Sequence, residues 1–181
     1  LPKPAGRVTS GRVMLEQDDL MAFSERQLRK VRGKRIGMIF QEPGKYLNPA
    51  YKISEQITET LILHLKMEKK RATEKALELL SLVGLGKSRR VLNSYPHELS
   101  GGMKQRAMIA MAIACQPALL IADEPTTALD VTIQAQILEL MIQLKEDYDT
   151  AIIMITHDPE IAEHAQRSIW IRDGLIQEDH T

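Results

Sequence analysis

The stretch Leu119-Leu120-Ile121-Ala122-Asp123-Glu124-Pro125 decides the fold class. Its first four residues, with Ala118 before them, are continuously apolar, which is typical of a strand buried in a parallel sheet. Two adjacent carboxylates follow this strand. A second apolar strand is predicted over residues 150–155, after a helix over 132–145. This order of strand, helix and strand indicates an α/β fold with a parallel sheet.

Other elements extend the pattern on both sides. Ser24 and Gln27 form a capping box that opens a basic helix over 24–32, and a strand follows over 35–41. Residues 42–49 are rich in chain breakers and predict a loop. The other predicted elements are a short strand over 11–16, helices over 53–67 and 72–83 joined by a charged link over 68–71, a helix over 100–115, a helix opened by Asp158 and Pro159, and a hairpin with strands over 168–172 and 175–178.

The composition narrows the classes of function. Lys and Arg together number 24, as do Asp and Glu, so the formal net charge is zero and gives no general reason to bind nucleic acid. No apolar stretch approaches the roughly 18 residues of a membrane span. The N-terminus also lacks the pattern of a signal peptide, so a cytoplasmic protein is predicted. Cys115 lies in an apolar run and is expected to be a core residue rather than a nucleophile.

Asp123 and Glu124 are the first candidates for chemistry. They follow a buried strand and are therefore expected at the carboxyl edge of the sheet, where ligands of such folds bind. One carboxylate can hold a hydrated Mg²⁺ while its neighbour orients an attacking water. The alternative is a strand end with two solvated acids.

Ser100-Gly101-Gly102 forms a second candidate site. Ser100 is expected to cap the helix that follows, and the two glycines leave the first backbone N–H groups unobstructed at a positive helix end. The segment therefore predicts an anion site. The alternative is an ordinary capped helix start with flexible glycines.

Gln41 and His157 each follow a predicted strand. The amide oxygen of Gln41 could join the shell of Mg²⁺ or of the attacking water. A histidine at a strand end can donate a hydrogen bond to a terminal phosphate, although most isolated histidines are surface or packing residues.

Taken in order, these motifs give the chain a resemblance to the nucleotide-binding domain of ABC transporters over nearly its full length. The motifs are Gln41 as the Q-loop, residues 99–105 as the signature motif, residues 119–124 as Walker B with its catalytic glutamate, residues 128–130 as the D-loop, and His157 as the H-loop. Segments 39–43, 47–49, 94–98 and 122–132 look like the dipeptide, oligopeptide and nickel importer subfamily, whereas residues 159–165 are closer to exporter-type cassettes.

The resemblance implies ATP and Mg²⁺ as ligands and assigns the site residues. Glu124 would polarise the water, His157 would hold the γ-phosphate, and Asp123 would serve Mg²⁺. Gln41 would serve both the metal and catalysis. The remaining residues implied to contact nucleotide, in part that of a partner subunit, are Ser100, Gly101, Gly102, Gln105 and Asp130.

The resemblance also implies an architecture and partners. It predicts a P-loop NTPase (RecA-like) core that is truncated at its N-terminus and carries an inserted helical subdomain. Residues 1–41 would be the remnant of the N-terminal core, 42–115 the helical subdomain with the signature motif, and 116–181 the core with Walker B, D-loop and H-loop. A second ATPase subunit is implied, together with a membrane permease that contacts the region after Gln41, chiefly residues 42–49. The chain would then be a motor subunit for import of peptides or nickel-type solutes, at the inner face of the cell membrane.

One family motif does not occur. No Gly-x-x-x-x-Gly-Lys-Ser/Thr octet, the loop that wraps phosphates, is found in the sequence. The nearest imitation is residues 81–88, where Ser81 replaces the first glycine and where Gly84 and Gly86 are expected to end a helix. We therefore expect a truncated gene or a part of a longer polypeptide, with negligible ATP hydrolysis by this chain alone. The alternatives are a soluble ABC ATPase acting on DNA or ribosomes and a non-catalytic cassette remnant.

Overall fold

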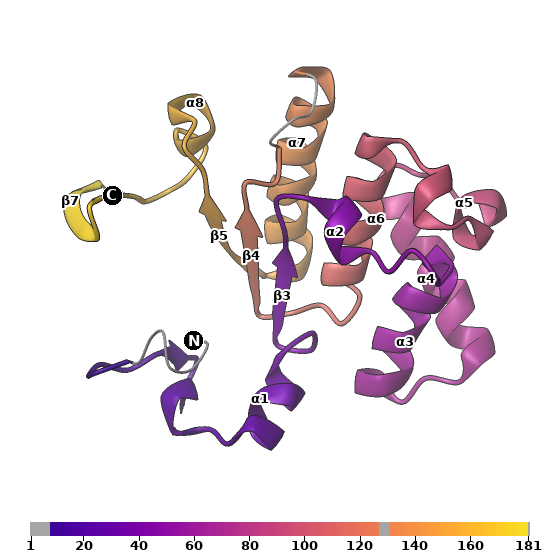
Figure 1. Ribbon diagram of the computed structural model, residues 1–181, viewed down its shortest axis with the longest axis horizontal. Helices are drawn as coiled ribbons and strands as arrows, with labels where there is room; N and C mark the ends of the chain where they lie inside the picture. Colours follow the sequence, from indigo (N-terminus) through magenta and orange to yellow (C-terminus); the bar gives the residue numbers. More distant parts are fainter. Residues whose placement is uncertain (1–7, 127–130, 181) are drawn as a thin grey trace.

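A three-stranded parallel sheet organises the molecule. The computed structural model describes residues 8–126 and 131–180 (Figure 1). Within them, β3 (Ile36–Ile39), β4 (Leu119–Asp123) and β5 (Ala151–Ile155) pair in the order β3-β4-β5. Met38 lies opposite Ile121, and Ile121 lies opposite Ile153. The three strands therefore run in register and end at a common carboxyl edge, as the sequence predicts.

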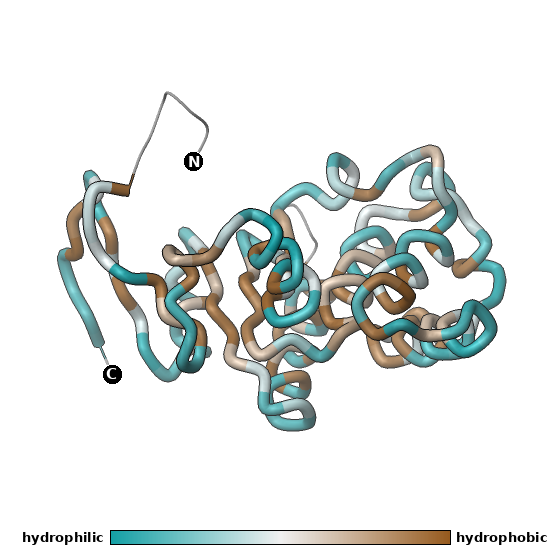
Figure 2. Tube along the Cα trace, turned by 90° about the horizontal axis from the view of Figure 1, so that it is seen from below, coloured by the Kyte–Doolittle hydropathy of each residue, from teal (hydrophilic) through white to brown (hydrophobic). Residues whose placement is uncertain are grey.

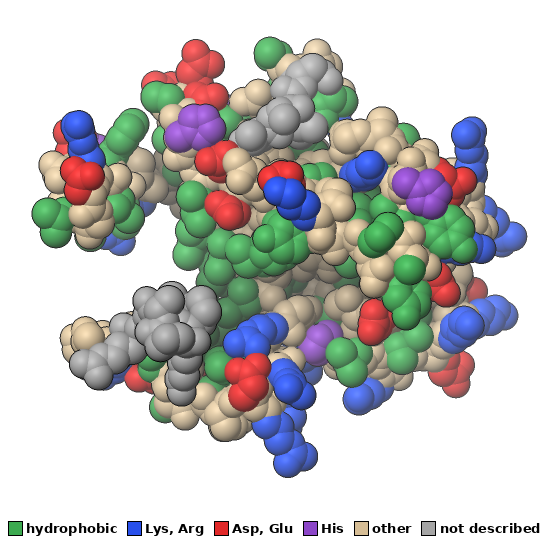
Figure 3. Space-filling view, viewed as in Figure 1, with side chains coloured by type: hydrophobic (Ala, Val, Ile, Leu, Met, Phe, Trp, Pro, Cys, Tyr) green, Lys and Arg blue, Asp and Glu red, His purple; other side chains and the backbone are tan. Residues whose placement is uncertain are grey.

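The two faces of this sheet differ in burial. Ile39, Leu120 and Ala122 on one face are fully buried, and α6 (Gly101–Ala112) and α7 (Val131–Tyr148) pack on this side. On the opposite face Met38 is 39% exposed and Ile153 51% exposed. We call this second side, with Met38, Ile121, Ile153 and Ile155, the open face. It shows as green side chains near the middle of the view in Figure 3.

The open face differs from the expectation for β4. A continuously apolar strand predicts burial on both sides, but β4 alternates between buried and partly exposed positions. Leu120 and Ala122 meet the helices, whereas Leu119, Ile121 and Asp123 point to the other side. Among the described residues no helix packs over that side as α6 and α7 do over the first.

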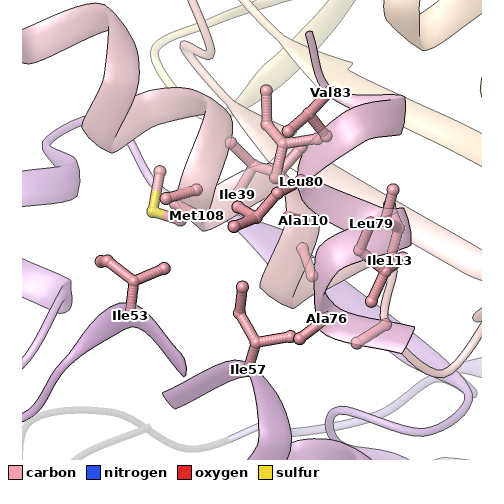
Figure 4. Packing of buried hydrophobic residues seen from close by; sticks show 14 of the residues in the cluster. Ile39, Ile53, Ile57, Ala76, Leu79, Leu80, Val83, Met108, Ala110 and Ile113 are labelled. Atoms are coloured by element: carbon pink, nitrogen blue, oxygen red, sulfur yellow. The ribbon is translucent and has the colours of Figure 1, made fainter. Parts of the chain in front are cut away.

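The helical part packs into the same core as the sheet. It contains α3 (Ile53–Leu65), α4 (Lys69–Leu82), α5 (Arg89–Asn93) and α6. Figure 4 shows its side chains close to Ile39 of β3. The labelled members of this cluster are Ile39, Ile53, Ile57, Ala76, Leu79, Leu80, Val83, Met108, Ala110 and Ile113. Figure 2 shows the same organisation, with brown apolar segments inside and teal polar segments on the outer turns.

Short elements border this core. β1 (Met14–Leu15) and β2 (Asp18–Asp19) pair antiparallel, η1 (Leu20–Ala22) follows, and α1 (Glu25–Val31) begins at the predicted capping box. After β5, α8 (Pro159–Ala162) is capped by the Asp158 side chain, as predicted. β6 (Ser168–Arg172) and β7 (Leu175–His180) form the predicted hairpin, which lies apart from the sheet in Figure 1. Among the described residues, no helix has the length and apolarity to cross a membrane.

The departures from the predicted elements are local. A short helix, α2 (Pro43–Tyr46), occupies the predicted loop, because Pro43 is tolerated in the first helical turn. Helix α4 already begins at Lys69, so most of the predicted charged link is helical. α5 and the 3₁₀ turn η2 (Pro96–Glu98) were not predicted. α5 depends on burial of Val91 and Leu92, which a five-residue segment does not reveal by periodicity.

Candidate functional site

The turn after β4 positions the first candidate residues. Asp123 is the last residue of β4, and Glu124 leaves the strand with φ of 45°, in the left-handed region. Such a conformation is costly for a residue other than glycine and persists only where neighbours fix it. Here the Glu124 N–H donates to the Ile155 carbonyl at 2.9 Å, so the backbone of the turn is tied to β5.

The Glu124 side chain joins three strand ends. Gln41, after β3, donates from Nε2 to Glu124 Oε2 at 2.6 Å. His157, after β5, places Nδ1 3.1 Å from Glu124 Oε1. We call this arrangement the carboxylate bridge. It brings Gln41, Glu124 and His157 together at the carboxyl edge of the sheet, where the sequence predicts them to meet.

Asp123 and Gln41 offer oxygen donors beside this bridge. Among the described residues no three His, Cys, Asp or Glu side chains form a metal cage. Mg²⁺ needs no such cage, because it is commonly held by one or two carboxylates together with phosphate oxygens and water. A carboxylate with a neighbouring amide oxygen is thus a donor set that fits Mg²⁺ bound jointly with a phosphate.

The start of α6 carries the other predicted site. Ser100 caps the helix, with its Oγ accepting from the Met103 N–H at 3.4 Å. A side chain at Gly101 would meet nothing within 4 Å, so the approach to this helix end is open. At Gly102 it would lie 3.5 Å from Ile133 of α7. The structure therefore has a capped and accessible helix end here.

Gln105 lies in the interior beside the Glu124 turn. The residue is only 2% exposed, and Nε2 donates to the carbonyl of Pro125 at 2.7 Å. Its amide thus contacts the residue that follows Glu124, and its expected contact with nucleotide stays a prediction.

Arg106 was missed by sequence reasoning. Its Nη1 donates to the carbonyl of Val83, which caps α4, at 2.7 Å. Its Nη2 donates to Gln136 of α7 at 2.5 Å. The sequence signal was its place directly after Gln105 on the same helix, but the two partners lie 23 and 30 residues away and follow no local pattern.

Two other predictions have different outcomes. The octet over residues 81–88 is a helix end, as predicted: Gly84 has φ of 76° and the Leu85 N–H donates to the Leu80 carbonyl at 2.8 Å. Asp130, with the predicted D-loop over 128–130, lies outside the described residues.

The comparisons with known proteins agree with these motifs. Residues 3–127 match the ABC transporter family. The chain belongs to the ABC transporter family. The resemblance inferred from the motifs is therefore confirmed.

Individual proteins of this ABC transporter family match the chain over nearly its whole length. The chain is 51% identical over 177 residues to the oligopeptide transport ATP-binding protein AppD of Bacillus subtilis, covering 97% of this chain and 54% of the relative. It is 53% identical over 179 residues to the probable peptide ABC transporter ATP-binding protein y4tR of Sinorhizobium fredii, covering 98% and 53%. The chain thus spans about half the length of the curated relatives it matches.

Solved structures show the same fold. The dimeric post-hydrolysis state of the ATP-binding cassette MJ0796, bound to ADP and Pi, matches with a TM-score of 0.84 and 31% identity, over 95% of this chain and 73% of that one. A second dimeric structure of MJ0796 has a TM-score of 0.85 at the same identity and coverage. The predicted α/β fold, a P-loop NTPase type of parallel sheet with helices, is therefore confirmed.

Proposed function

We propose that this ABC transporter chain supplies the hydrolytic carboxylate of an ATPase that drives peptide import. The observation that carries the proposal is the carboxylate bridge, in which Gln41 and His157 hold Glu124 at the ends of three parallel strands. The names of the similar relatives, which are peptide transport proteins, support the cargo. They do not favour the alternative of a soluble ATPase acting on DNA or ribosomes.

In the proposed reaction Glu124 orients and polarises the attacking water. A carboxylate whose two oxygens are already engaged by Gln41 and His157 has a fixed direction, so a water held by it has a defined line of attack. His157, which contacts Glu124 through Nδ1, would hold the γ-phosphate through its other ring nitrogen, Nε2. Asp123 and Gln41 would hold Mg²⁺, which neutralises charge on the phosphate oxygens when bound.

The remaining contacts with ATP are proposed to be divided between subunits. Ser100, Gly101 and Gly102, at the open end of α6, would meet the γ-phosphate of ATP held mainly by a second ATPase subunit. Asp130 would contribute to nucleotide binding at the same interface. Because the sequence has no phosphate loop and residues 81–88 form a helix end, the grip on the phosphates would come from outside this chain.

The permease is proposed to dock beside the carboxylate bridge. Residues 42–49 directly follow Gln41, and Tyr46 stacks on Phe40 with ring centroids 3.7 Å apart. This stacking ties α2 to the end of β3, so movement of α2 would reach Gln41. Attachment to the membrane would then occur only through the permease, at its cytoplasmic side.

The proposal also assigns parts of the chain to separate roles. Residues 42–115 would form the helical subdomain, and 1–41 and 116–181 would contribute to the ATPase core. The order of elements supports this division, since α3 to α6 lie between β3 and β4.

The experiment compares hydrolysis by two glutamate variants. In the natural protein at its full encoded length, Mg²⁺-dependent phosphate release should fall about 100-fold or more in Glu124→Gln. The matched control Glu139→Gln, at an exposed position of α7, should retain wild-type activity. The 181-residue chain alone should hydrolyse ATP negligibly.

Two outcomes would overturn parts of the proposal. Full activity of Glu124→Gln would remove Glu124 from the reaction. Mg²⁺-dependent hydrolysis by the 181-residue chain, abolished by Glu124→Gln, would show that the phosphates are gripped within this chain after all. No hydrolysis by the full-length wild type would favour a non-catalytic role.

A further inference from the structure

The backbone around Glu124 is fixed from two directions. On one side the Glu124 N–H donates to the Ile155 carbonyl of β5. On the other side the carbonyl of Pro125 accepts from the buried amide of Gln105 at 2.7 Å. The residue between these two anchors has a left-handed backbone, with φ of 45°. The contact from Gln105 therefore acts on a turn whose backbone conformation is costly.

Arg106, the residue after Gln105, fixes helix α6 to its neighbours. Arg106 reaches Val83 at the end of α4 and Gln136 of α7. A Cβ atom at Gly84 would lie 2.8 Å from Arg106 Nη1, so the chain passes close to the guanidinium and leaves it little freedom. Two consecutive side chains of α6 thus connect the Glu124 turn with the last turn of α4 and with α7.

We propose that Gln105 is a positioning residue that couples the placement of α6 to the orientation of Glu124. Arg106 provides the fixed reference by tying α6 to α4 and α7. The capped end of α6 at Ser100 and the turn at Glu124 then move as one body. The inference rests on the proposed hydrolytic function, and it replaces a contact of Gln105 with nucleotide by an action through the protein.

The physical reason is that removing only the donor of a buried hydrogen bond leaves the acceptor buried without a partner. Without the Gln105 amide, the carbonyl of Pro125 loses its donor while it stays buried between α6 and β4. The turn can regain a partner for this carbonyl only by moving. Such a movement shifts the Glu124 carboxylate away from Gln41 and His157, and small displacements of a reacting group cost large factors in rate.

The test uses Gln105→Met, which keeps the length and volume of the side chain but removes the donor. The matched control is Thr150→Val, because the buried Thr150 hydroxyl donates to the carbonyl of Pro117 at 2.9 Å, before the opposite end of β4. Both variants remove one buried bond to a proline carbonyl. Both are made in the natural protein at its full length, with Mg²⁺ and ATP as the probe.

The expected result is a split between the two kinetic constants. Gln105→Met should lower kcat about tenfold and leave the KM for ATP within about twofold of wild type, since the lost bond acts on the reacting geometry. Thr150→Val should lower thermal stability about as much as Gln105→Met does, but it should leave kcat unchanged. A raised KM with unchanged kcat in Gln105→Met would show direct nucleotide contact and overturn the proposal. Equal kcat values for Gln105→Met and wild type would also overturn it.

A second variant keeps the proposal falsifiable should Gln105→Met not fold. In Gln105→Glu the carboxyl can donate to the Pro125 carbonyl only when it is protonated. The ratio of its kcat to that of wild type should therefore fall as pH rises from about 6 to 8, because burial raises a carboxyl pKa toward this range. A ratio that does not change with pH would refute the coupling. Loss of hydrolysis in Glu124→Gln tests the proposed function separately, so the two ideas can fail independently.

Discussion

Gly84→Ala is expected to destabilise the protein more than a glycine substitution at a helix end normally does. Gly84 has φ of 76°, and an alanine in this left-handed region costs about 1–2 kcal/mol. Its Cβ would also lie 2.8 Å from Arg106 Nη1, so the guanidinium must move from the Val83 carbonyl. Losing one hydrogen bond to a charged group adds roughly 1.5–3 kcal/mol. Together the two effects predict a loss of about 2.5–5 kcal/mol in the free energy of unfolding.

Gly86→Ala separates the two effects in the same loop. Gly86 has φ of 65°, but a Cβ there would meet nothing within 4 Å. Only the backbone cost of about 1–2 kcal/mol applies. Urea unfolding followed by circular dichroism should therefore rank wild type above Gly86→Ala and Gly86→Ala above Gly84→Ala. Equal losses for the two variants would refute the claim that Arg106 occupies the space beside Gly84.

Three further predictions concern titration, reactivity and association. Burial, with Lys34 and then Lys66, lowers the pKa of His64 from its ordinary 6.5. The unfolded chain therefore takes up a proton first, so stability should fall as pH drops below about 6.5 and His64→Gln should flatten this dependence in urea titrations. Burial raises the pKa of the Cys115 thiol, so iodoacetamide should label it slowly in native protein and quickly in urea; equal rates would contradict its burial. The 181-residue chain should self-associate through the open face in analytical ultracentrifugation, and Ile153→Lys should reduce association without unfolding; unchanged association would point to another surface.

Sequence reasoning predicted a parallel sheet and the meeting of Gln41, Glu124 and His157 at its edge. Both follow from strong local signals, because each residue ends an apolar strand and parallel strands share one carboxyl edge. The capping box of Ser24 with Gln27 and the Asp173-Gly174 turn were also predicted, since the chemistry of each is confined to a few consecutive residues.

The contacts of Gln105 and Arg106 could not be predicted in this way. A glutamine near a helix start carries no sign that its amide faces inward, and its partner is a backbone carbonyl 20 residues away. Backbone acceptors have no sequence identity, so only the packing of α6 against the turn after β4 reveals them. The burial of β4 was overestimated for a related reason. An apolar run indicates that its side chains favour burial, but it does not show which elements cover each face of the strand.

The carboxylate bridge has a consequence for how the chain transmits movement. Its two hydrogen bonds join positions that are 83 and 33 residues apart in the sequence. If the end of β3 or of β5 moved away by the length of one hydrogen bond, one oxygen of Glu124 would lose its partner. The carboxylate could then rotate. The orientation of the Glu124 carboxylate thereby depends on the relative alignment of three separate chain segments.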